Sequence, residues 1–311
     1  MFIYSDTNKR YHTFDYHLKH KFSSKVFKVS LNAGFTCPNI DGSKGYGGCT
    51  YCSSLGSGDF GGSPNLSLKD QFDEIKSNVH NKWPDAKYIA YFQANTNTYA
   101  PIETLKLIFE EVLTYKNVVG ISIATRADCI PDEVADYLMD LSKRTFLIVE
   151  LGLQTINDDI GEKINRCHSY GDFLTGFNKL KSRDINVCVH IINGLPNETK
   201  EMMLDTINAV AKLNVHSVKL HLLHVIKGTK MAEQYQNNEF ELLSLENYIN
   251  IICDQIERLP KEVVIQRITG DGDKNTLIGP LWSTNKLVVM NSIDKELVRR
   301  NSYQGIKFNN V

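Results

Sequence analysis

The sequence predicts an α/β fold in which a parallel sheet curls into a partial (β/α)6 TIM-type barrel. Apolar strand-like runs alternate with helical patterns along most of the 311 residues, which is typical of βα units. The six or seven units fit a complete or incomplete barrel better than a small doubly wound sheet. No change in composition indicates a second folded domain, and the length suffices for one large α/β core.

The predicted elements follow one another regularly along the chain. The strands are short apolar runs at 24–31, 88–93, 118–124, 146–153, 186–192, 217–223 and 263–267. The helices are expected at 68–83, 102–116, 131 onward, 171–184, 199–213 and 244–258. Ser67 and Asp70 are placed as a capping pair, and Pro131 is a favoured first-turn residue. Because parallel βα arrays carry their chemistry at the carboxyl ends of the strands, we expect a site in the loops that follow the strands.

Three segments are expected: an N-terminal arm over 1–23, the partial barrel over 24–268, and a C-terminal extension over 269–311 packed on the barrel. Residues 9–28 hold six lysines and arginines against the single acid Asp15, with aromatic residues interleaved. This mixture suits a phosphate backbone and unstacked bases. A solvated arm that packs its aromatic residues on the domain is an equally open interpretation.

The overall composition is that of a globular protein, with 42% hydrophobic and 23% charged residues. A net charge of −1 does not favour nucleic-acid binding by the chain as a whole. The first 22 residues lack the apolar run of a signal peptide, and no segment approaches the roughly 20 apolar residues of a membrane span. We therefore expect a cytoplasmic protein with no membrane partner, whose thiols stay reduced.

Three cysteines, Cys37, Cys49 and Cys52, share one loop directly after the first predicted strand. Eight of the 20 glycines fall between Gly42 and Gly62, so this backbone can wrap closely around a bulky group. A structural zinc site normally has four protein ligands, and so does a fully protein-ligated [4Fe-4S] cluster. Three thiolates therefore imply a metal centre with one position open for chemistry. The other four cysteines are scattered, and no second cluster is expected.

The loop ends in Cys49-Thr50-Tyr51-Cys52, which resembles the Cys-x-aromatic-Cys ending of the radical S-adenosylmethionine (SAM) motif. The wide first spacing is similar to the branch of that superfamily that contains the Elongator catalytic subunit and MiaB-like proteins. Further resemblance to this branch, and to its YtqA/YhcC-like (MnmL-like) family, lies in segments 93–101, 125–128, 150–155, 164–168 and 190–198. Cys167 and Asn197 stand where two of these elements usually have glycine. The resemblance covers roughly residues 10–290, and it assigns no role to Cys167 or to residues 267–272.

This resemblance implies a radical SAM core with two cofactors. A [4Fe-4S] cluster would be held by Cys37, Cys49 and Cys52, and SAM would chelate the fourth iron. A flavodoxin- or ferredoxin-type donor would supply the electron that cleaves SAM to methionine and a 5′-deoxyadenosyl radical. That radical would abstract hydrogen from the substrate, so the protein's share is binding, position and shielding.

Six side chains are candidates for binding SAM: Tyr51, Gln93, Arg126, Glu150, Gln154 and Arg166. Arg166 is the candidate for the methionine carboxylate because a guanidinium binds a carboxylate bidentately, and a surface helix cap is its alternative role. Glu150 and Gln154, near the end of one strand, could hold the ribose hydroxyls. A buried glutamate is costly unless it is paired, which favours a function for Glu150.

The remaining candidates rest mainly on the resemblance. It places Gln93 near the SAM amino group and Tyr51 against the adenine or the cluster. Arg126 is open to two roles, binding SAM or a substrate phosphate, or forming a rim ion pair with Asp128. His190 is equally open to a place in the core and a place in the site.

The resemblance also implies a substrate, the wobble uridine of tRNA. The expected reaction converts a carboxymethylaminomethyl side chain to an aminomethyl side chain. The residues themselves hint at RNA only in the basic arm and near Arg299 and Arg300. Two alternatives stay open: radical SAM chemistry on a small molecule or porphyrin, and a non-catalytic, zinc-stabilised RNA-binding module. In the second, His12, His17 or His20 would complete a Cys3His site.

Overall fold

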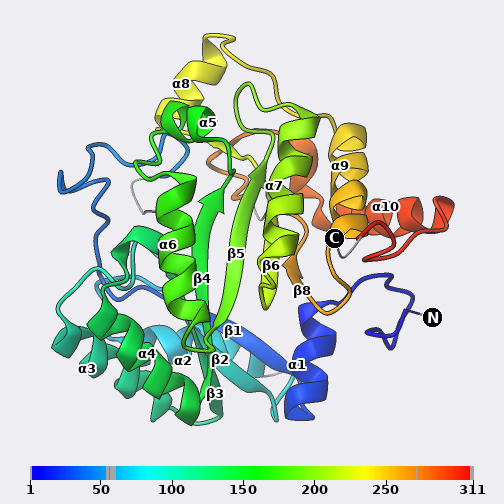
Figure 1. Cartoon of the computed structure of the whole chain (residues 1–311). Coiled ribbons are helices and arrows are strands. Elements are labelled where there is room, and N and C mark those ends of the chain that lie inside the picture. Colours follow the sequence, from blue (N-terminus) through cyan, green and yellow to red (C-terminus); the bar gives the residue numbers. More distant parts are fainter. Residues whose placement is uncertain (1, 54–55, 57–60, 81, 271, 309–311) are drawn as a thin grey trace.

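The computed structural model describes residues 2–53, 56, 61–80, 82–270 and 272–308, which form an α/β fold around a curled parallel sheet (Figure 1). Its seven strands lie in the order β1-β2-β3-β4-β5-β6-β8, and each neighbouring pair is parallel. The strands are β1 (Val26–Leu31), β2 (Lys87–Phe92), β3 (Val118–Thr125), β4 (Phe146–Gln154), β5 (Asn186–Asn193), β6 (Ser217–Leu222) and β8 (Val264–Arg267). In the described chain β1 and β8 are the two edges of the sheet, so the predicted partial barrel is confirmed as an open half-barrel.

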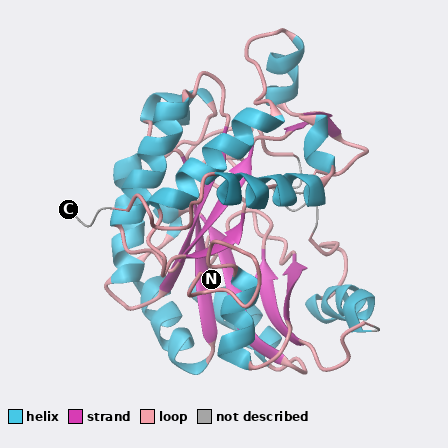
Figure 2. Ribbon diagram, turned by 90° about the vertical axis from the view of Figure 1, so that its right-hand side faces the viewer, coloured by secondary structure: helices cyan, strands magenta, loops and turns pink. Residues whose placement is uncertain are grey.

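Helices cover the outer face of this sheet, as Figure 2 shows from the side. The α-helices are α1 (Phe14–Phe22), α2 (Leu68–His80), α3 (Ile102–Leu113), α4 (Asp132–Arg144), α5 (Asp158–Lys163), α6 (Tyr170–Lys181), α7 (Lys200–Lys212), α8 (Lys230–Gln236), α9 (Leu245–Arg258) and α10 (Lys286–Arg299). Helices α2, α3, α4, α6 and α7 pack on the strands, and α9 packs on α7. Across the described residues, no helix combines the length and the apolar character needed to cross a membrane.

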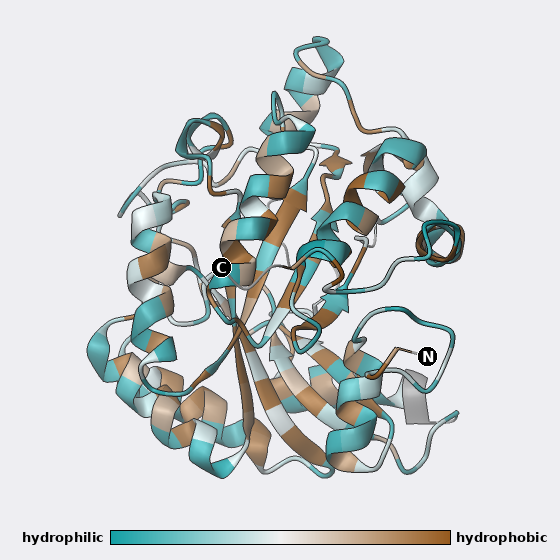
Figure 3. Ribbon diagram, turned by 45° about the vertical axis from the view of Figure 1, so that its right-hand side comes forward, coloured by the Kyte–Doolittle hydropathy of each residue, from teal (hydrophilic) through white to brown (hydrophobic). Residues whose placement is uncertain are grey.

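The two faces of the sheet differ in polarity because successive side chains of a strand point to opposite faces. On the outer face, strand residues such as Val29 and Val149 are buried against helix residues such as Phe109 and Phe177 in the main core. In Figure 3 brown residues are frequent along the strands, whereas the helices carry both brown and teal residues. The alternate strand positions point into the half-barrel, and several of them carry charge.

The helix starts agree with the capping signals in the sequence. The Ser67 hydroxyl accepts the backbone N–H of Asp70 at 3.1 Å and donates to its carboxylate at 2.7 Å, which confirms the capping pair. Pro131 lies just before α4, which begins at Asp132, one residue later than predicted. Helix α2 ends at His80, before the predicted end at residue 83.

Several elements were not predicted from the sequence: helices α1, α5, α8 and α10, and an antiparallel ribbon of β7 (Val225–Ile226) and β9 (Leu277–Gly279). Helix α1 lies at the amino ends of the strands, at the bottom of Figure 1, whereas α5 and α8 lie at the opposite end. The apolar residues Phe14, Leu18 and Phe22 of α1 pack with Ile89 and Phe146. Helix α1 therefore covers the half-barrel at the amino ends of the strands.

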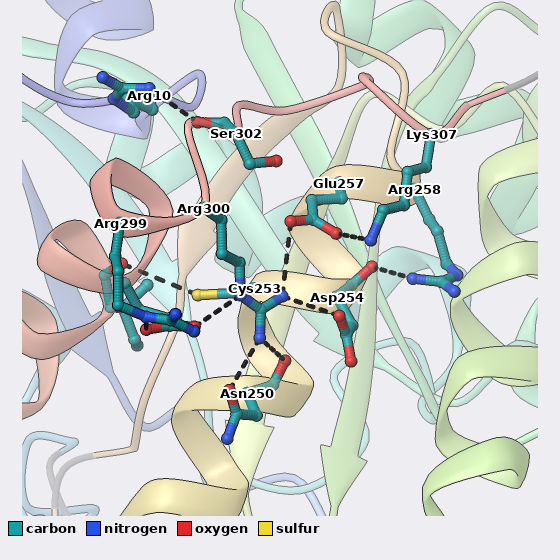
Figure 4. A network of polar contacts seen from close by, with 12 residues as sticks. Arg10, Asn250, Cys253, Asp254, Glu257, Arg258, Arg299, Arg300, Ser302 and Lys307 are labelled. Atoms are coloured by element: carbon teal, nitrogen blue, oxygen red, sulfur yellow. Dashed lines mark hydrogen bonds and ion pairs between the residues drawn. The ribbon is translucent and has the colours of Figure 1, made fainter.

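The C-terminal part is fixed to the barrel through α9, on which α10 packs. A network of charged side chains joins the two helices, and Arg300 lies at its centre (Figure 4). The guanidinium of Arg300 binds Glu296 at 2.7 Å, Asp254 at 2.8 Å, the side chain of Asn250 at 2.8 Å and Glu257 at 3.4 Å. The division into arm, barrel and extension stays a prediction, although α1 and α10 both pack on neighbouring elements.

Candidate active site

A cavity lies at the carboxyl ends of the strands, where the loop after β1 approaches the ends of β2, β3 and β4. All nine site residues predicted from the sequence line it: Cys37, Cys49, Cys52, Tyr51, Gln93, Arg126, Glu150, Gln154 and Arg166. They come from five different segments of the chain, so the fold brings together what the sequence separates. The individual roles of these residues stay predictions, and the geometry around each is described below.

Two asparagines hold the cysteine loop in place. The side chain of Asn39 donates to the carbonyl of Asn165 and lies 3.6 Å from the Sγ of Cys49. The side chain of Asn165 in turn donates to the carbonyls of Tyr46 at 3.1 Å and Gly48 at 2.7 Å. The loop after β1 is therefore tied to the segment after α5, and the thiols do not depend on the loop backbone alone for their position.

The segment after α5 has a conformation suited to glycine. Cys167 in this segment and Asn197 in the loop after β5 stand where the resembled elements have glycine, and their φ values of +58° and +63° lie in the left-handed region. Cys167 packs against the cysteine loop, since a Cβ added to Gly45 would lie 2.7 Å from its Sγ and 2.3 Å from the side-chain oxygen of Asn39. A glycine at position 45 is thus needed for the close approach of the two segments.

The thiol of Cys49 is poised to become a thiolate, which is the form that binds metal. A hydrogen bond with Cys52 lowers the pKa of Cys49 to about 6, and a hydrogen bond with Tyr51 and the charge of Arg126 act in the same direction. Burial opposes this shift but does not outweigh it. The donor set is therefore chemically suited to an iron–sulfur cluster.

The Sγ atoms of the three loop cysteines do not all lie within 4.8 Å of one another, although Cys49 and Cys52 are hydrogen-bonded. In the described residues, the group whose ligand atoms all lie within 4.8 Å of one another is Glu150, Cys188 and His190, and the three loop cysteines form no such group. A mononuclear site needs close convergence on one ion, because its metal–ligand bonds are only about 2.0–2.3 Å long. The Glu150 group holds no free position for a cation, because the ammonium groups of Lys28 and Lys219 already pair with Glu150.

The histidines that could have completed a zinc site lie elsewhere. His12 and His17 line a cavity with His216 at the amino ends of β6 and β8, the opposite end of the half-barrel. His20 is exposed and lies 3.6 Å from Asp6. The alternative in which one of these histidines supplies a fourth ligand is therefore wrong, because α1 and the residues just before it lie at the amino ends of the strands.

Three of the proposed SAM contacts lie around the mouth of the cavity. Gln93 directly follows β2, and Gln154 ends β4 with φ of +62°, which turns the chain away from the strand. Tyr51 lies between two of the cysteines and also lines a second cavity that adjoins the first. These placements are compatible with the predicted contacts to SAM, which stay predictions.

Arg126 builds the rim of the cavity. Its guanidinium donates to both carboxylate oxygens of Asp128, at 3.0 and 2.9 Å, so the alternative of a rim ion pair is confirmed. It also donates to the carbonyls of Arg166 at 2.8 Å and Cys167 at 3.1 Å. Arg126 thereby fixes the segment that holds the cysteine loop.

Arg166 is 1% exposed, so the alternative of a surface helix cap is wrong. It donates four hydrogen bonds within the protein: to the carbonyls of Leu153 at 2.7 Å, Thr155 at 2.6 Å and His168 at 2.8 Å, and to the carboxylate of Asp158 at 2.8 Å. A guanidinium has five N–H groups. The geometry therefore gives Arg166 mainly a positioning role between β4 and α5, and direct binding of the SAM carboxylate stays a prediction.

Glu150 lies deeper, in the interior of the half-barrel, where it is 1% exposed. Ser122 donates to its carboxylate at 2.6 Å, and His190 Nε2 lies 2.7 Å from it. Although burial acts to raise it, the charges of Lys219 and Lys28 hold the pKa of Glu150 well below its usual range. Both carboxylate oxygens thus have partners in the protein, and ribose binding by Glu150 stays a prediction.

Sequence reasoning missed the floor of the cavity and one residue of its wall. Lys219 and His221, two residues apart on β6, both line the cavity, as does Tyr91 on β2. His168 also lines it beside the cysteines, and burial lowers the pKa of His168 to about 4. A signal for the floor was present in the sequence, because polar residues at alternate positions of an otherwise apolar strand indicate an inward polar face.

Comparison with known proteins agrees with this geometry. Residues 44–210 match the Radical SAM superfamily, and residues 215–299 match the Radical_SAM C-terminal domain. The chain is 54% identical over 304 residues to "Uncharacterized protein YtqA" of Bacillus subtilis, which covers 98% of this chain and 94% of that protein. It is 34% identical over 281 residues to "Protein YhcC" of Escherichia coli, which covers 90% of each.

More distant similarities concern the fold and part of the chain. The solved structure of an archaeal Elp3 from Methanocaldococcus infernus matches with a TM-score of 0.68 at 19% identity, covering 90% of this chain and 64% of that one. A "tRNA uridine(34) acetyltransferase" of Methanocaldococcus jannaschii is 28% identical over 170 residues, or 54% of this chain and 31% of that protein. The similarity to the archaeal Elp3 structure shows that this chain has the same type of fold.

Proposed function

The chain belongs to the radical SAM superfamily, in the group that includes YtqA and YhcC, and we propose that it modifies tRNA through radical chemistry. When bound, the family's [4Fe-4S] cluster and SAM supply a 5′-deoxyadenosyl radical that abstracts hydrogen from a substrate. The observation that carries the proposal is a set of three cysteines on one cavity wall at the carboxyl end of a half-barrel.

The residues of this chain perform the tasks that the cofactors do not. Cys37, Cys49 and Cys52 hold the cluster, and the low pKa of Cys49 favours the thiolate form that the cluster needs. Gln93 and Gln154 bind SAM at the strand ends, while Tyr51 shields it. Arg126 and Arg166 position the segment that packs on the loop, and their contact with SAM is part of the proposal.

The substrate part of the proposal is the wobble uridine of tRNA. It is supported by the similarity, over about half of this chain, to a protein named as a tRNA uridine(34) acetyltransferase. The proposed reaction removes the carboxymethyl group as glyoxylate. Loss of a hydrogen atom and one electron from its methylene would leave an imine, water would hydrolyse this imine to the aminomethyl side chain, and SAM would be the net oxidant. The basic arm over 1–23 would contact the RNA, a flavodoxin- or ferredoxin-type protein would supply electrons, and the reaction would take place in the cytoplasm.

Nucleoside mass spectrometry of tRNA from a deletion strain tests the substrate. We expect the carboxymethylaminomethyl form to accumulate and the aminomethyl form to disappear, with recovery when the gene is restored. Restoring a Cys49→Ala variant instead is the matched control and should not bring recovery. An unchanged wobble-uridine profile contradicts the tRNA assignment and favours a small-molecule or porphyrin substrate.

A further inference from the structure

The floor of the cavity is a charged cluster buried inside the half-barrel. Lys219 and His221 occupy inward positions of β6, and Glu150 and His190 face them from β4 and β5. Lys219 is 5% exposed, and its ammonium donates to Tyr91 Oη at 3.0 Å and pairs with Glu150. Because β6 continues for three residues beyond Lys219, this residue lies about 10 Å below the rim.

The formal charges on this floor do not cancel. The carboxylate of Glu150 meets two ammonium groups, those of Lys28 and Lys219. Burial lowers the pKa of His190 to about 4, so this imidazole adds no charge at neutral pH. Burial lowers the pKa of Lys219 to about 8, which leaves it largely protonated. The three ionised groups therefore carry a net charge of +1, and a buried charge without a counterion is costly.

The two ammonium groups differ in how many of their three N–H donors are used. Lys28 donates to Glu150, to Ser122 at 3.2 Å and to Gln266 at 2.8 Å, and it does not line the cavity. Lys219 has two acceptors among the described residues, and its third donor faces the cavity that it lines. The excess charge and the unused donor thus belong to the same side chain.

A second polar group on the floor also lacks a partner. Nε2 of His221 is buried and has no hydrogen-bond partner within the described part of the chain. His221 lines both the cysteine cavity and the adjoining cavity. Two neighbouring inward positions of one strand therefore present a cation and an imidazole nitrogen to the same space.

We propose that Lys219 and His221 form a subsite for a carboxylate carried by the substrate. This inference rests on the proposed function, in which the wobble uridine bears a carboxymethylaminomethyl group. Lys219 would bind the carboxylate, and His221 would bind a second polar atom of the same side chain. The subsite would distinguish the substrate from its product, because the product lacks the carboxylate that would bind the unused donor of Lys219 and balance the excess charge.

The test compares the binding of two anticodon stem-loop RNAs that differ only at the wobble position. One carries 5-carboxymethylaminomethyluridine and the other 5-aminomethyluridine, and the holoprotein with cluster and SAM is kept without reductant so that no turnover occurs. We expect the wild type to bind the first RNA at least tenfold more tightly. Lys219→Met should reduce this preference to less than twofold, whereas Lys219→Arg, which keeps the charge, should retain most of it.

Lys28→Met is the matched control. It also removes an ammonium group that pairs with Glu150, but it does not change the cavity wall. It should keep most of the preference, whatever its effect on stability. His221→Phe leaves every ion pair of Glu150 in place, so it is the variant to use if Lys219→Met does not fold. It should weaken binding of the carboxylated RNA at least threefold. Equal binding of both RNAs by the wild type, or full preference in Lys219→Met and His221→Phe, overturns the inference.

Two further measurements separate this inference from other sources of a carboxylate. SAM affinity should change less than twofold in Lys219→Met, and a tenfold loss overturns the inference because the floor would then hold the methionine carboxylate of SAM. If the wild type binds neither RNA, the proposed function fails, and acetate and malonate become the probes. Thermal stabilisation by these anions that Lys219→Met lacks then supports the carboxylate subsite, and no stabilisation overturns it.

Discussion

The two ends of the half-barrel each hold three side chains of a type that commonly binds metal, and the two groups are built differently. At the carboxyl ends, Cys37, Cys49 and Cys52 lie in a glycine-rich loop that is fixed by hydrogen bonds from neighbouring segments. At the amino ends, three histidines lie between α1 and the sheet: His12, His17 and His216. The difference lies in what surrounds the side chains and not in the residue type alone.

The histidines at the amino ends contact one another and other aromatic rings beside a cavity. The ring of His17 lies 5.6 Å from that of His12 and 5.2 Å from that of His216, and His12 stacks on Tyr4 at 4.5 Å. Burial lowers the pKa of each of these three histidines, so they are neutral at pH 7. The cysteine end instead holds a thiol with a lowered pKa and a floor with unused donors. We therefore expect substitutions at the carboxyl end to affect activity and those at the amino end to affect stability.

The largest expected effect is the loss of the cluster. Replacing Cys37, Cys49 or Cys52 by Ala leaves two protein thiolates, too few to retain the cluster. Formation of 5′-deoxyadenosine in the presence of dithionite should fall at least about 100-fold, roughly 3 kcal/mol in activation free energy. Iron analysis and chromatography of the products measure both effects.

The control for this series is Cys167→Gly, which removes a thiol that packs on the same loop. Because Cys167 has φ of +58°, glycine suits the backbone there, and iron content and 5′-deoxyadenosine formation should stay near wild type. Normal product formation by any of the three ligand variants contradicts the assignment of the ligands.

The next expected effect is a loss of stability when the charged residues between the two ends, in the interior of the half-barrel, lose their carboxylate. Glu150→Gln removes the carboxylate that pairs with Lys28 and Lys219 and leaves two buried ammonium groups without a counterion. Breaking a buried ion pair in this way should lower the free energy of unfolding by about 3–5 kcal/mol. Chemical denaturation measures it, with Glu103→Gln on the exposed face of α3 as a control that should be near neutral. A stable Glu150→Gln protein would show that the interior charges are not held by this carboxylate.

A smaller effect on stability is expected at the C-terminal network of Figure 4. Arg300→Ala removes the side chain that joins Asp254, Glu257 and Glu296, and should lower the free energy of unfolding by about 1–2 kcal/mol. Arg299→Ala removes a neighbouring and exposed arginine whose one ion-pair partner among the described residues is Glu296, so the melting temperature of this variant should match that of the wild type. Equal losses in the two variants would contradict this account of the network.

The last expected effect is the pH dependence of the free energy of unfolding that arises from the histidines at the amino ends of the strands. The pKa of His17 is lowered to about 4 and that of His216 to about 3, chiefly by burial, whereas histidines in the unfolded chain titrate near 6.5. Below pH 6.5 the unfolded chain therefore binds more protons, and stability falls as the pH falls toward 4. The slope from His216 should be at most about 1.4 kcal/mol per pH unit.

Denaturation of the anaerobic holoprotein between pH 7 and 5 measures this slope. His216→Gln should reduce it, and the exposed His20→Asn should leave it unchanged. A slope that His216→Gln does not alter would show that the pH dependence arises elsewhere, for example at buried carboxylates.

The sequence predicts the sheet well because each strand is a short apolar run, and the cysteine loop is recognisable because its ligand spacing is local. Helix α1 was missed although Phe14, Leu18 and Phe22 recur every four residues, because the surrounding lysines suggested a solvated arm. The position of that helix decides where His12, His17 and His20 lie, so the alternative of a histidine as fourth ligand fails with it. The local sequence pattern does not show at which end of the sheet a helix packs, and the error arises from this.

The contacts among the residues of the deep floor could not be predicted, for a related reason. Lys219 and Glu150 are far apart in the chain and meet only because the strands are in register, with His190 between them in the sheet. Arg166 is a different case. The sequence predicts that its guanidinium binds a ligand carboxylate, but in the described structure the guanidinium donates four hydrogen bonds within the protein. Residue type predicts which chemistry is possible, and the partners in the fold decide which is used.

The central claim is that Cys37, Cys49 and Cys52 hold a cluster with one iron open to SAM. Electron paramagnetic resonance of the reduced, reconstituted protein with and without SAM tests this claim most directly. The account predicts a [4Fe-4S] signal whose g values change when SAM is added, because SAM ligates the open iron. A signal that SAM leaves unchanged, or reconstituted protein that holds zinc and no iron, would contradict it.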